Sequence, residues 1–326
     1  MKKILTFFLI TILFFSCGNK TAQQSNNKQV AEIKVPAFNA DSAYNFVKTQ
    51  VDFGPRVPQT EPHKKCAEYL VAKLKDFGAE VEIQQGKGTL YNGRSIDIQN
   101  IIGKLNPNAN NRILLCAHWD SRPYADHDKD ESKHNTPILG ANDGASGVGV
   151  LLEISRNLKT LPENIGIDII FFDVEDWGAP QFYKGNQQND SWCIGSKFWA
   201  QEAKKANYRA YFGILLDMVG APNARFYKEY YSMQYAANIV EKVWNKAQIL
   251  GFDGYFINKA GGEIMDDHIY INTIAQIPCI DIIHYEPNSP NGFGEYWHTT
   301  QDDMRNIDKN TLFAVGMVLL NVIFSE

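Results

Sequence analysis

Histidine and carboxylate side chains recur along this chain, and most of them directly follow an apolar run. Neutral imidazole and carboxylate oxygens are ligands of Zn²⁺, and a catalytic zinc site keeps one position open for water or substrate. A single Asp at the end of a strand is more often a turn residue or a helix cap, but the ordered set favours a zinc hydrolase-type centre. The set comprises His118, Asp120, Asp143, Glu175, Asp176, Asp217 and His298.

Three apolar runs, at residues 112–117, 165–172 and 210–216, are expected to be buried strands. The helical patterns at 144–158 and 195–206 between them imply crossover connections in a parallel sheet. Sites in open sheets form at the carboxyl ends of the strands, so the acidic groups are expected to meet there. The expected fold class is α/β, with a single domain built on an open, twisted, mostly parallel (mixed) sheet flanked by helices.

Composition limits the function classes. The chain has 326 residues and 44% hydrophobic content, which is ample for one sizeable core, and we expect one domain over residues 36–326. The formal net charge of −5 argues against a nucleic-acid partner.

The first residues predict export. Residues 1–16 carry two lysines and then an apolar run, as in a signal peptide, and this run is shorter than the ~20 residues of a membrane-spanning helix. Ser16 before Cys17 resembles the lipobox of bacterial lipoproteins, although Phe14 stands where Leu is usual. We expect cleavage before Cys17, lipidation of Cys17 and a flexible tether over 17–35; ordinary secretion is the alternative. The expected location is therefore the periplasm or outer membrane of a bacterium, with membrane contact through the lipid anchor only.

The remaining cysteines, Cys66, Cys116, Cys193 and Cys279, are even in number and could form disulfides in an oxidising compartment. The apolar surroundings of Cys66, Cys116 and Cys279 favour buried thiols instead. A glycine-rich stretch at residues 144–149 lacks the spacing of a nucleotide-binding loop, and its expected role is close backbone approach at a helix start. Serine-hydrolase and His-Glu-x-x-His motifs are absent from the sequence.

The order of these groups resembles that of the co-catalytic zinc aminopeptidase superfamily, and within it that of the glutaminyl cyclases. The resemblance runs from about residue 40 to the C-terminus, and the last three of its six segments are the cyclase-like ones. The segments are AHWDSR at 117–122, GANDGA at 140–145, FFDVED at 171–176, LDMVGAPN at 216–223, DDHI at 266–269 and YWHT at 296–299.

The resemblance implies roles for individual residues. Asp143, Asp176 and His298 would be the ligands of a single Zn²⁺, and Glu175 would be the acid/base that transfers protons. Asp217 and Asp266 would support Glu175 by hydrogen bonding. Asp176 stands where animal cyclases carry Glu, which shortens this ligand by one methylene.

The chemistry of glutamine cyclisation suits these roles. The α-amine of an N-terminal glutamine attacks its own γ-carbonyl, giving pyroglutamate and ammonia, so nucleophile and electrophile are already tethered. One Lewis acid then suffices, and Glu175 moves the proton. Nearby carboxylates, Asp217 and Asp266, are expected to raise the proton affinity of Glu175.

Aromatic side chains are expected to form the substrate pocket. The candidates are Trp297, Phe293 and Trp192, with Tyr296 beside them, and ordinary core packing is the alternative for each. His268 is expected to be structural, and the polar loop at 126–136, which contains His127 and His134, is expected to be solvated.

Two other functions stay open. A di-zinc aminopeptidase could use His118, Asp143 and Asp217 for a second metal, with Asp143 bridging and Asp120 orienting His118. A catalytically silent peptide receptor is the other alternative, although it would not need Glu175. We favour one zinc ion per chain, without excluding two, and expect a monomer whose partners are peptides or proteins with N-terminal glutamine.

Overall fold

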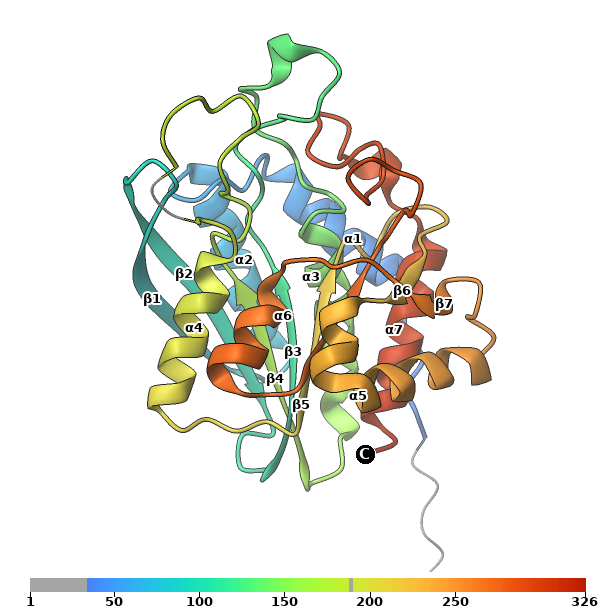
Figure 1. Ribbon diagram of the computed structural model, residues 1–326. Coiled ribbons are helices and arrows are strands. Elements are labelled where there is room, and N and C mark those ends of the chain that lie inside the picture. The colour runs from blue at the N-terminus through green and yellow to red at the C-terminus, as the bar shows by residue number, and fades with distance from the viewer. Residues whose placement is uncertain (1–33, 188–189) are drawn as a thin grey trace, which may run out of the picture. The chain divides into compact units, whose positions relative to one another are not determined.

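The computed structural model describes residues 34–187 and 190–326, and Val35–Glu326 form one compact unit (Figure 1). The predicted signal peptide, Cys17 and nearly all of the expected tether lie outside the described residues. Within the described part, no helix is both long and apolar enough to cross a membrane.

A six-stranded mixed sheet forms the centre of this unit, in the order β1-β2-β4-β3-β5-β8. Strands β3, β4, β5 and β8 are parallel, whereas β1 and β2 pair antiparallel with their neighbours at one edge. A separate two-stranded sheet contains β6 and β7. The strands are β1 (Glu80–Thr89), β2 (Ser95–Leu105), β3 (Asn111–His118), β4 (Ile165–Phe172), β5 (Phe212–Asp217), β6 (Phe226–Lys228), β7 (Phe256–Ala260) and β8 (Cys279–Ile283).

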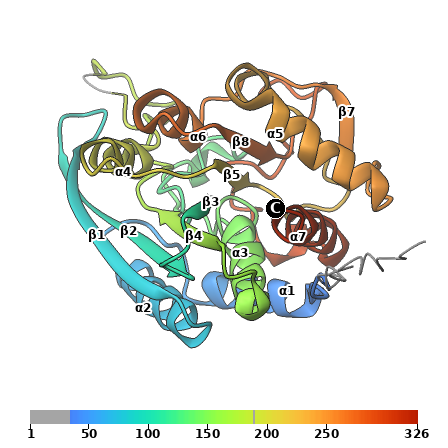
Figure 2. The ribbon, with the colours of Figure 1, turned by 90° about the horizontal axis from the view of Figure 1, so that it is seen from below.

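Helices cover both faces of the sheet (Figure 2). α1, α2, α3 and α7 lie on one face, α4 and α6 lie on the other, and α5 packs along β8. The helices are α1 (Ala40–Asp52), α2 (Glu61–Asp76), α3 (Ala145–Asn157), α4 (Ile194–Lys205), α5 (Tyr230–Ile249), α6 (Asp267–Tyr270) and α7 (Lys309–Ile323).

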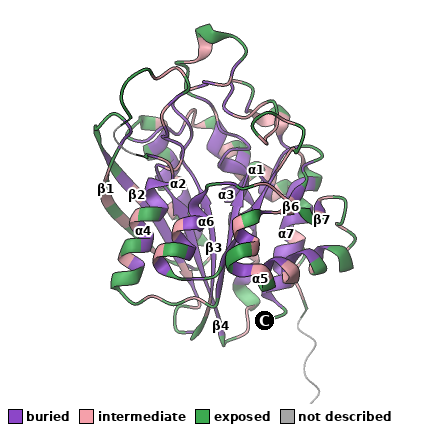
Figure 3. Cartoon of the chain, viewed as in Figure 1, coloured by how far each residue is buried: buried purple, intermediate pink, exposed green. Residues whose placement is uncertain are grey.

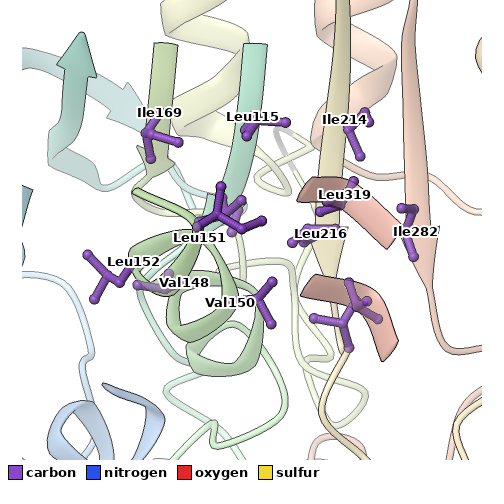
Figure 4. Close-up of a cluster of buried hydrophobic side chains, with 14 of the residues drawn as sticks. Leu115, Val148, Val150, Leu151, Leu152, Ile169, Ile214, Leu216, Ile282 and Leu319 are labelled. Carbon is purple, nitrogen blue, oxygen red and sulfur yellow. The ribbon is translucent and has the colours of Figure 1, made fainter. Parts of the chain in front are cut away.

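The core lies between the sheet and the helices, where the parallel strands β3, β4, β5 and β8 are buried along most of their length (Figure 3). Leu115, Ile169 and Ile214 of the central strands face Leu151 of α3 and Leu319 of α7 (Figure 4). Every residue of β4 is buried, as expected of a central strand covered on both faces.

Local sequence explains where the helices next to the site begin. The Thr60 side chain accepts a hydrogen bond from the His63 N–H and caps α2. Gly147 lies in the first turns of α3, and a Cβ at this position would meet the carbonyl oxygen of Leu216 on β5. Only glycine permits this close approach, as the glycine-rich stretch predicted.

The predicted fold class is confirmed, and the expected strands and helices are found within two residues of their predicted bounds. Cys66, Cys116, Cys193 and Cys279 are unpaired and buried, which confirms the expectation of buried thiols.

Candidate active site

The predicted site residues meet at the carboxyl ends of the central parallel strands, among the loops at the top of Figure 1. His118 ends β3 and Asp217 ends β5, while Glu175 and Asp176 follow β4. His298 arrives from the segment between β8 and α7.

Asp143 lies between two histidines. Its Oδ1 is 3.0 Å from His118 Nε2 and its Oδ2 is 3.6 Å from His298 Nε2. Asp176 Oδ1 is 3.3 Å from His298 Nε2, and Asp217 Oδ1 is 3.3 Å from His118 Nε2. Two triads therefore share Asp143, and in each triad the potential ligand atoms lie within 4.8 Å of one another.

The donor set of both triads, imidazole nitrogen and carboxylate oxygen, suits Zn²⁺. A second observation favours the triad of Asp143, Asp176 and His298. Asp176 Oδ2 is buried and has no hydrogen-bond partner among the described residues. A buried acceptor without a donor is costly, and a bound cation would satisfy it.

Arg122 and Asp126 contact two members of this triad, Asp176 and His298. The Arg122 guanidinium donates to both oxygens of Asp126, at 2.7 and 2.8 Å, and to Asp176 Oδ1 at 3.1 Å. Asp126 Oδ1 lies 3.7 Å from His298 Nδ1, on the side of the ring away from Asp143. Such a carboxylate orients a ligand histidine.

Two further carboxylates, those of Asp120 and Asp302, accept hydrogen bonds from main-chain N–H groups of the site. Asp120, expected to orient His118, lies 3.5 Å from His118 Nδ1 and also accepts the N–H groups of Glu175 and Asp176 at 3.1 and 3.3 Å. Asp302 accepts the N–H groups of Asn142 and Asp143 at 2.8 and 3.1 Å.

Glu175 is nearly buried, with 13% of its side chain exposed. The Cys193 thiol donates to its Oε1 at 3.2 Å, and its Oε2 lies 3.9 Å from His118 Nδ1. Burial raises the pKa of Glu175 well above its ordinary value, His118 lowers it in part, and the carboxylates of Asp176, Asp266 and Asp267 raise it further. The expected influence of Asp266 is therefore found.

The expected influence of Asp217 on Glu175 is less direct, because Asp217 faces His118. Burial raises the pKa of Asp217 to about 6, with His118 opposing and Asp143 adding to the rise. Burial and the neighbouring Asp217 raise the pKa of Asp266 to about 7.

A cavity of about 240 Å³ opens beside these groups. The three expected aromatic residues line it, and Trp297 stacks on His298 with ring centroids 3.7 Å apart. Met265, 59% exposed, also lines this cavity. A larger cleft of about 780 Å³ lies between α2 and β1–β2, away from both triads. The residues that line the cavity of about 240 Å³ beside the triads are Asp143, Glu175, Asp176, Trp192, Asp217, Met218, Ile264, Met265, Asp266, Ile283, Phe293, Trp297 and His298.

The expectation that the whole 126–136 loop is solvated is wrong at its first residues. Asp126 and Asp128 are buried, because Arg122 and Thr300 donate to their carboxylates. His127 is half-buried, with its ring centroid 4.3 Å from that of Trp297.

His268 is fully buried and lies 3.2 Å from Glu229, away from both triads. This placement agrees with the structural role expected of it.

Sequence reasoning gave no role to Arg122, Asp126, Asp302 or Cys193. Arg122 belongs to the AHWDSR segment, and Asp302 lies four residues after His298. Their closeness in sequence to predicted site residues could have suggested a role for both. The contact between Cys193 and Glu175 depends on how the loop before α4 folds back.

The chain is similar to zinc-dependent exopeptidases and to glutaminyl cyclases. The family model "Peptidase family M28" matches residues 100–323. A structure of Tannerella forsythia glutaminyl cyclase is 55% identical, with a TM-score of 0.86, and the match covers 89% of this chain and 100% of that one. A Zn-dependent exopeptidase from Parabacteroides distasonis is also 55% identical, with a TM-score of 0.87 and coverage of 90% and 100%. The glutaminyl-peptide cyclotransferase of Dictyostelium discoideum is 23% identical over 96% of both chains.

Proposed function

The chain belongs to peptidase family M28, and we propose that it is a glutaminyl-peptide cyclotransferase. It converts the N-terminal glutamine of peptides and proteins to pyroglutamate and releases ammonia. The supporting relatives are glutaminyl cyclases from bacteria and the curated cyclotransferases. The observation that carries the proposal is Glu175, a carboxylate outside the favoured triad, beside a cavity of about 240 Å³. This volume is below the ~300–1,000 Å³ of typical ligand pockets and suits one small side chain.

Asp143, Asp176 and His298 would hold Zn²⁺, which supplies Lewis-acid polarisation of a carbonyl oxygen when bound. Trp297, Phe293 and Trp192 form the walls that hold the glutamine side chain and exclude water. Holding the substrate folded brings its own α-amine against its γ-carbonyl carbon, so no activated water is required.

Glu175 takes the proton from the attacking α-amine and delivers it to the departing nitrogen, which leaves as ammonia. A raised pKa suits this task because the group must both accept and release a proton near neutral pH. Asp120 fixes the backbone of Glu175, and the carboxylates of Asp176, Asp266 and Asp267 supply the neighbouring negative charge.

One zinc ion per chain is the favoured stoichiometry. Among the described residues, the favoured triad contains a buried oxygen without a partner, Asp176 Oδ2. In the other triad, Asp217 is already paired with His118. Measuring zinc per chain distinguishes this arrangement from the two-metal site of an aminopeptidase.

Export is proposed on the sequence pattern alone. Residues 1–16 would be a signal peptide, with lipid on Cys17 and a periplasmic or outer-membrane location for a monomeric enzyme. Fractionation of cells that express either the wild-type chain or a Cys17→Ser variant tests the anchor. Only the wild-type chain should partition with membranes.

The activity test uses two peptides, one beginning with Gln and one beginning with Leu. Ammonia released from the first peptide without free Leu from the second supports cyclisation. Free Leu without ammonia would overturn the proposal in favour of aminopeptidase activity. This alternative is tested because one similar structure is that of a Zn-dependent exopeptidase.

A further inference from the structure

Two more groups of potential metal ligands lie among the described residues, and one of them, Asp126, His127 and His298, shares His298 with the favoured triad. The other group is separate from the favoured triad. Glu175, Cys193 and Asp266 each offer a ligand atom, and these atoms lie within 4.8 Å of one another. Cys193 is 2% exposed, and its Sγ lies 3.2 Å from Glu175 Oε1. None of the three belongs to the triad proposed for the catalytic zinc, so both sites could be filled at once.

The backbone holds the thiol in this position. Cys193 lies just before α4 with a positive φ of 54°, a conformation that is uncommon for residues other than glycine. Its N–H donates to the Glu175 carbonyl oxygen at 2.9 Å. The residue is therefore bound to Glu175 through both its main chain and its side chain.

Asp266 supplies an oxygen that lacks a partner. It is 5% exposed and lines the cavity, and its Oδ2 is buried without a hydrogen-bond partner among the described residues. Its other oxygen accepts the Asp267 N–H at 2.5 Å. The adjacent Asp267 is fully buried, and neither of its oxygens has a hydrogen-bond partner within the described part of the chain. A buried carboxyl group without a partner either holds a proton or binds a cation, because an uncompensated buried charge is costly.

We propose that Glu175, Cys193 and Asp266 form an inhibitory binding site for a soft divalent cation, such as excess Zn²⁺ or Cd²⁺. A thiolate ligand selects soft ions over Mg²⁺ and Ca²⁺, which prefer oxygen ligands alone. On binding, the metal–sulfur bond replaces the thiol S–H bond, and the proton passes to solvent. Two divalent ions are tolerated in neighbouring sites, as two-metal enzymes with ions about 3.5–4 Å apart demonstrate.

The functional consequence follows from Glu175. Once its carboxylate binds the cation, it no longer transfers protons, and turnover stops even though the catalytic zinc is retained. This inhibition rests on the proposed function, whereas the binding itself does not.

The test titrates Cd²⁺ into the zinc-loaded protein and follows three readouts. These are the ultraviolet thiolate-to-cadmium charge-transfer band, the zinc released to an indicator dye and the rate with a Gln-initiated peptide. We expect one Cd²⁺ per chain with the band, no zinc release and at least tenfold inhibition, whereas Mg²⁺ has none of these effects.

Variants assign the site. Cys193→Ser should abolish the band and raise the half-inhibitory Cd²⁺ concentration at least tenfold, relative to the variant's own uninhibited rate. Cys66→Ala is the matched control, because this buried thiol lies outside the three-residue group, and it should keep the band.

Absence of the band in the wild-type protein would overturn the proposal, as would stoichiometric zinc release or an unchanged half-inhibitory concentration in Cys193→Ser. If Cys193→Ser does not fold, Cys193→Ala is the second variant, and it should lose the band in the same way. Failure of the proposed function would appear separately, as a wild-type protein without activity on the peptide.

Discussion

Arg122 lies between two buried carboxylates of the site, and we expect its removal to cost more stability than removal of a surface arginine. Its guanidinium donates two hydrogen bonds to the Asp126 carboxylate, one to the Asp176 carboxylate and one to the Asp176 carbonyl oxygen, and the side chains of all three residues are 1% exposed. Arg122→Met keeps much of the apolar volume but removes the guanidinium from both carboxylates, so that Asp126 keeps, among the described residues, only the Gln181 N–H as a donor. Breaking a buried pair in this way costs about 3–5 kcal/mol of unfolding free energy.

The pKa of Asp126 gives an independent estimate of part of this cost. Burial raises the pKa of Asp126, but Arg122 lowers it more strongly, so that it falls from 3.8 to about 2. This difference corresponds to roughly 2 kcal/mol of stability. The folded pKa is the lower one, so the stabilisation is fully present above pH 4 and is lost as the pH falls toward 2. The remainder of the expected cost belongs to Asp176.

Urea unfolding of the zinc-loaded protein at pH 7 measures the cost. A double-mutant cycle with Asp126→Asn should recover about 2 kcal/mol of coupling. Arg305→Met is the matched control, because Arg305 also holds a carboxylate, that of Asp303, with two nitrogens but is 77% exposed. A cost below about 1 kcal/mol for Arg122→Met, within the range of exposed ion pairs, would refute the reasoning.

Three further outcomes are expected. Glu175→Gln should keep its zinc, measured by elemental analysis, and lower kcat about 10²–10⁴-fold; zinc loss would instead assign Glu175 as a ligand. Asp302→Ala removes the acceptor of the Asn142 and Asp143 N–H groups, and chelator competition should show weaker zinc binding, with about 1–3 kcal/mol lost in urea unfolding. Met265→Ala should lower kcat/KM for Gln-Phe relative to Gln-Gly peptides by about three- to tenfold, through lost apolar contact at the cavity wall; an equal ratio argues against that contact.

The central strands could be predicted from sequence because their signal is local. β3, β4 and β5 are apolar runs that end in polar residues, and burial on both faces requires no alternation. β1 lies at the sheet edge and is partly exposed along its length, so its sequence, EVEIQQGKGT, contains no apolar run. Its assignment depends on pairing with β2, which is a tertiary contact.

In the site too, residues marked by a local sequence signal could be predicted, whereas residues placed by tertiary contacts could not. The candidate ligands stand directly after predicted strands, so topology alone brings them to one edge of the sheet. Asp126 and Asp128 looked like solvated loop residues because their partners, Arg122 and Thr300, are fixed only by the folded loops. Cys193 was given no role for the same reason, since its contact with Glu175 is made across a loop.

His298 reaches the sheet edge from a segment beyond β8, after all the strands of the main sheet. A chain truncated just after β8 would therefore hold every strand of that sheet but only two members of the favoured triad. A metal ion bound by Asp143, Asp176 and His298 would then link the segment between β8 and α7 to the middle of the chain. Chelation should accordingly make the stretch between β8 and α7 the first target of an added protease.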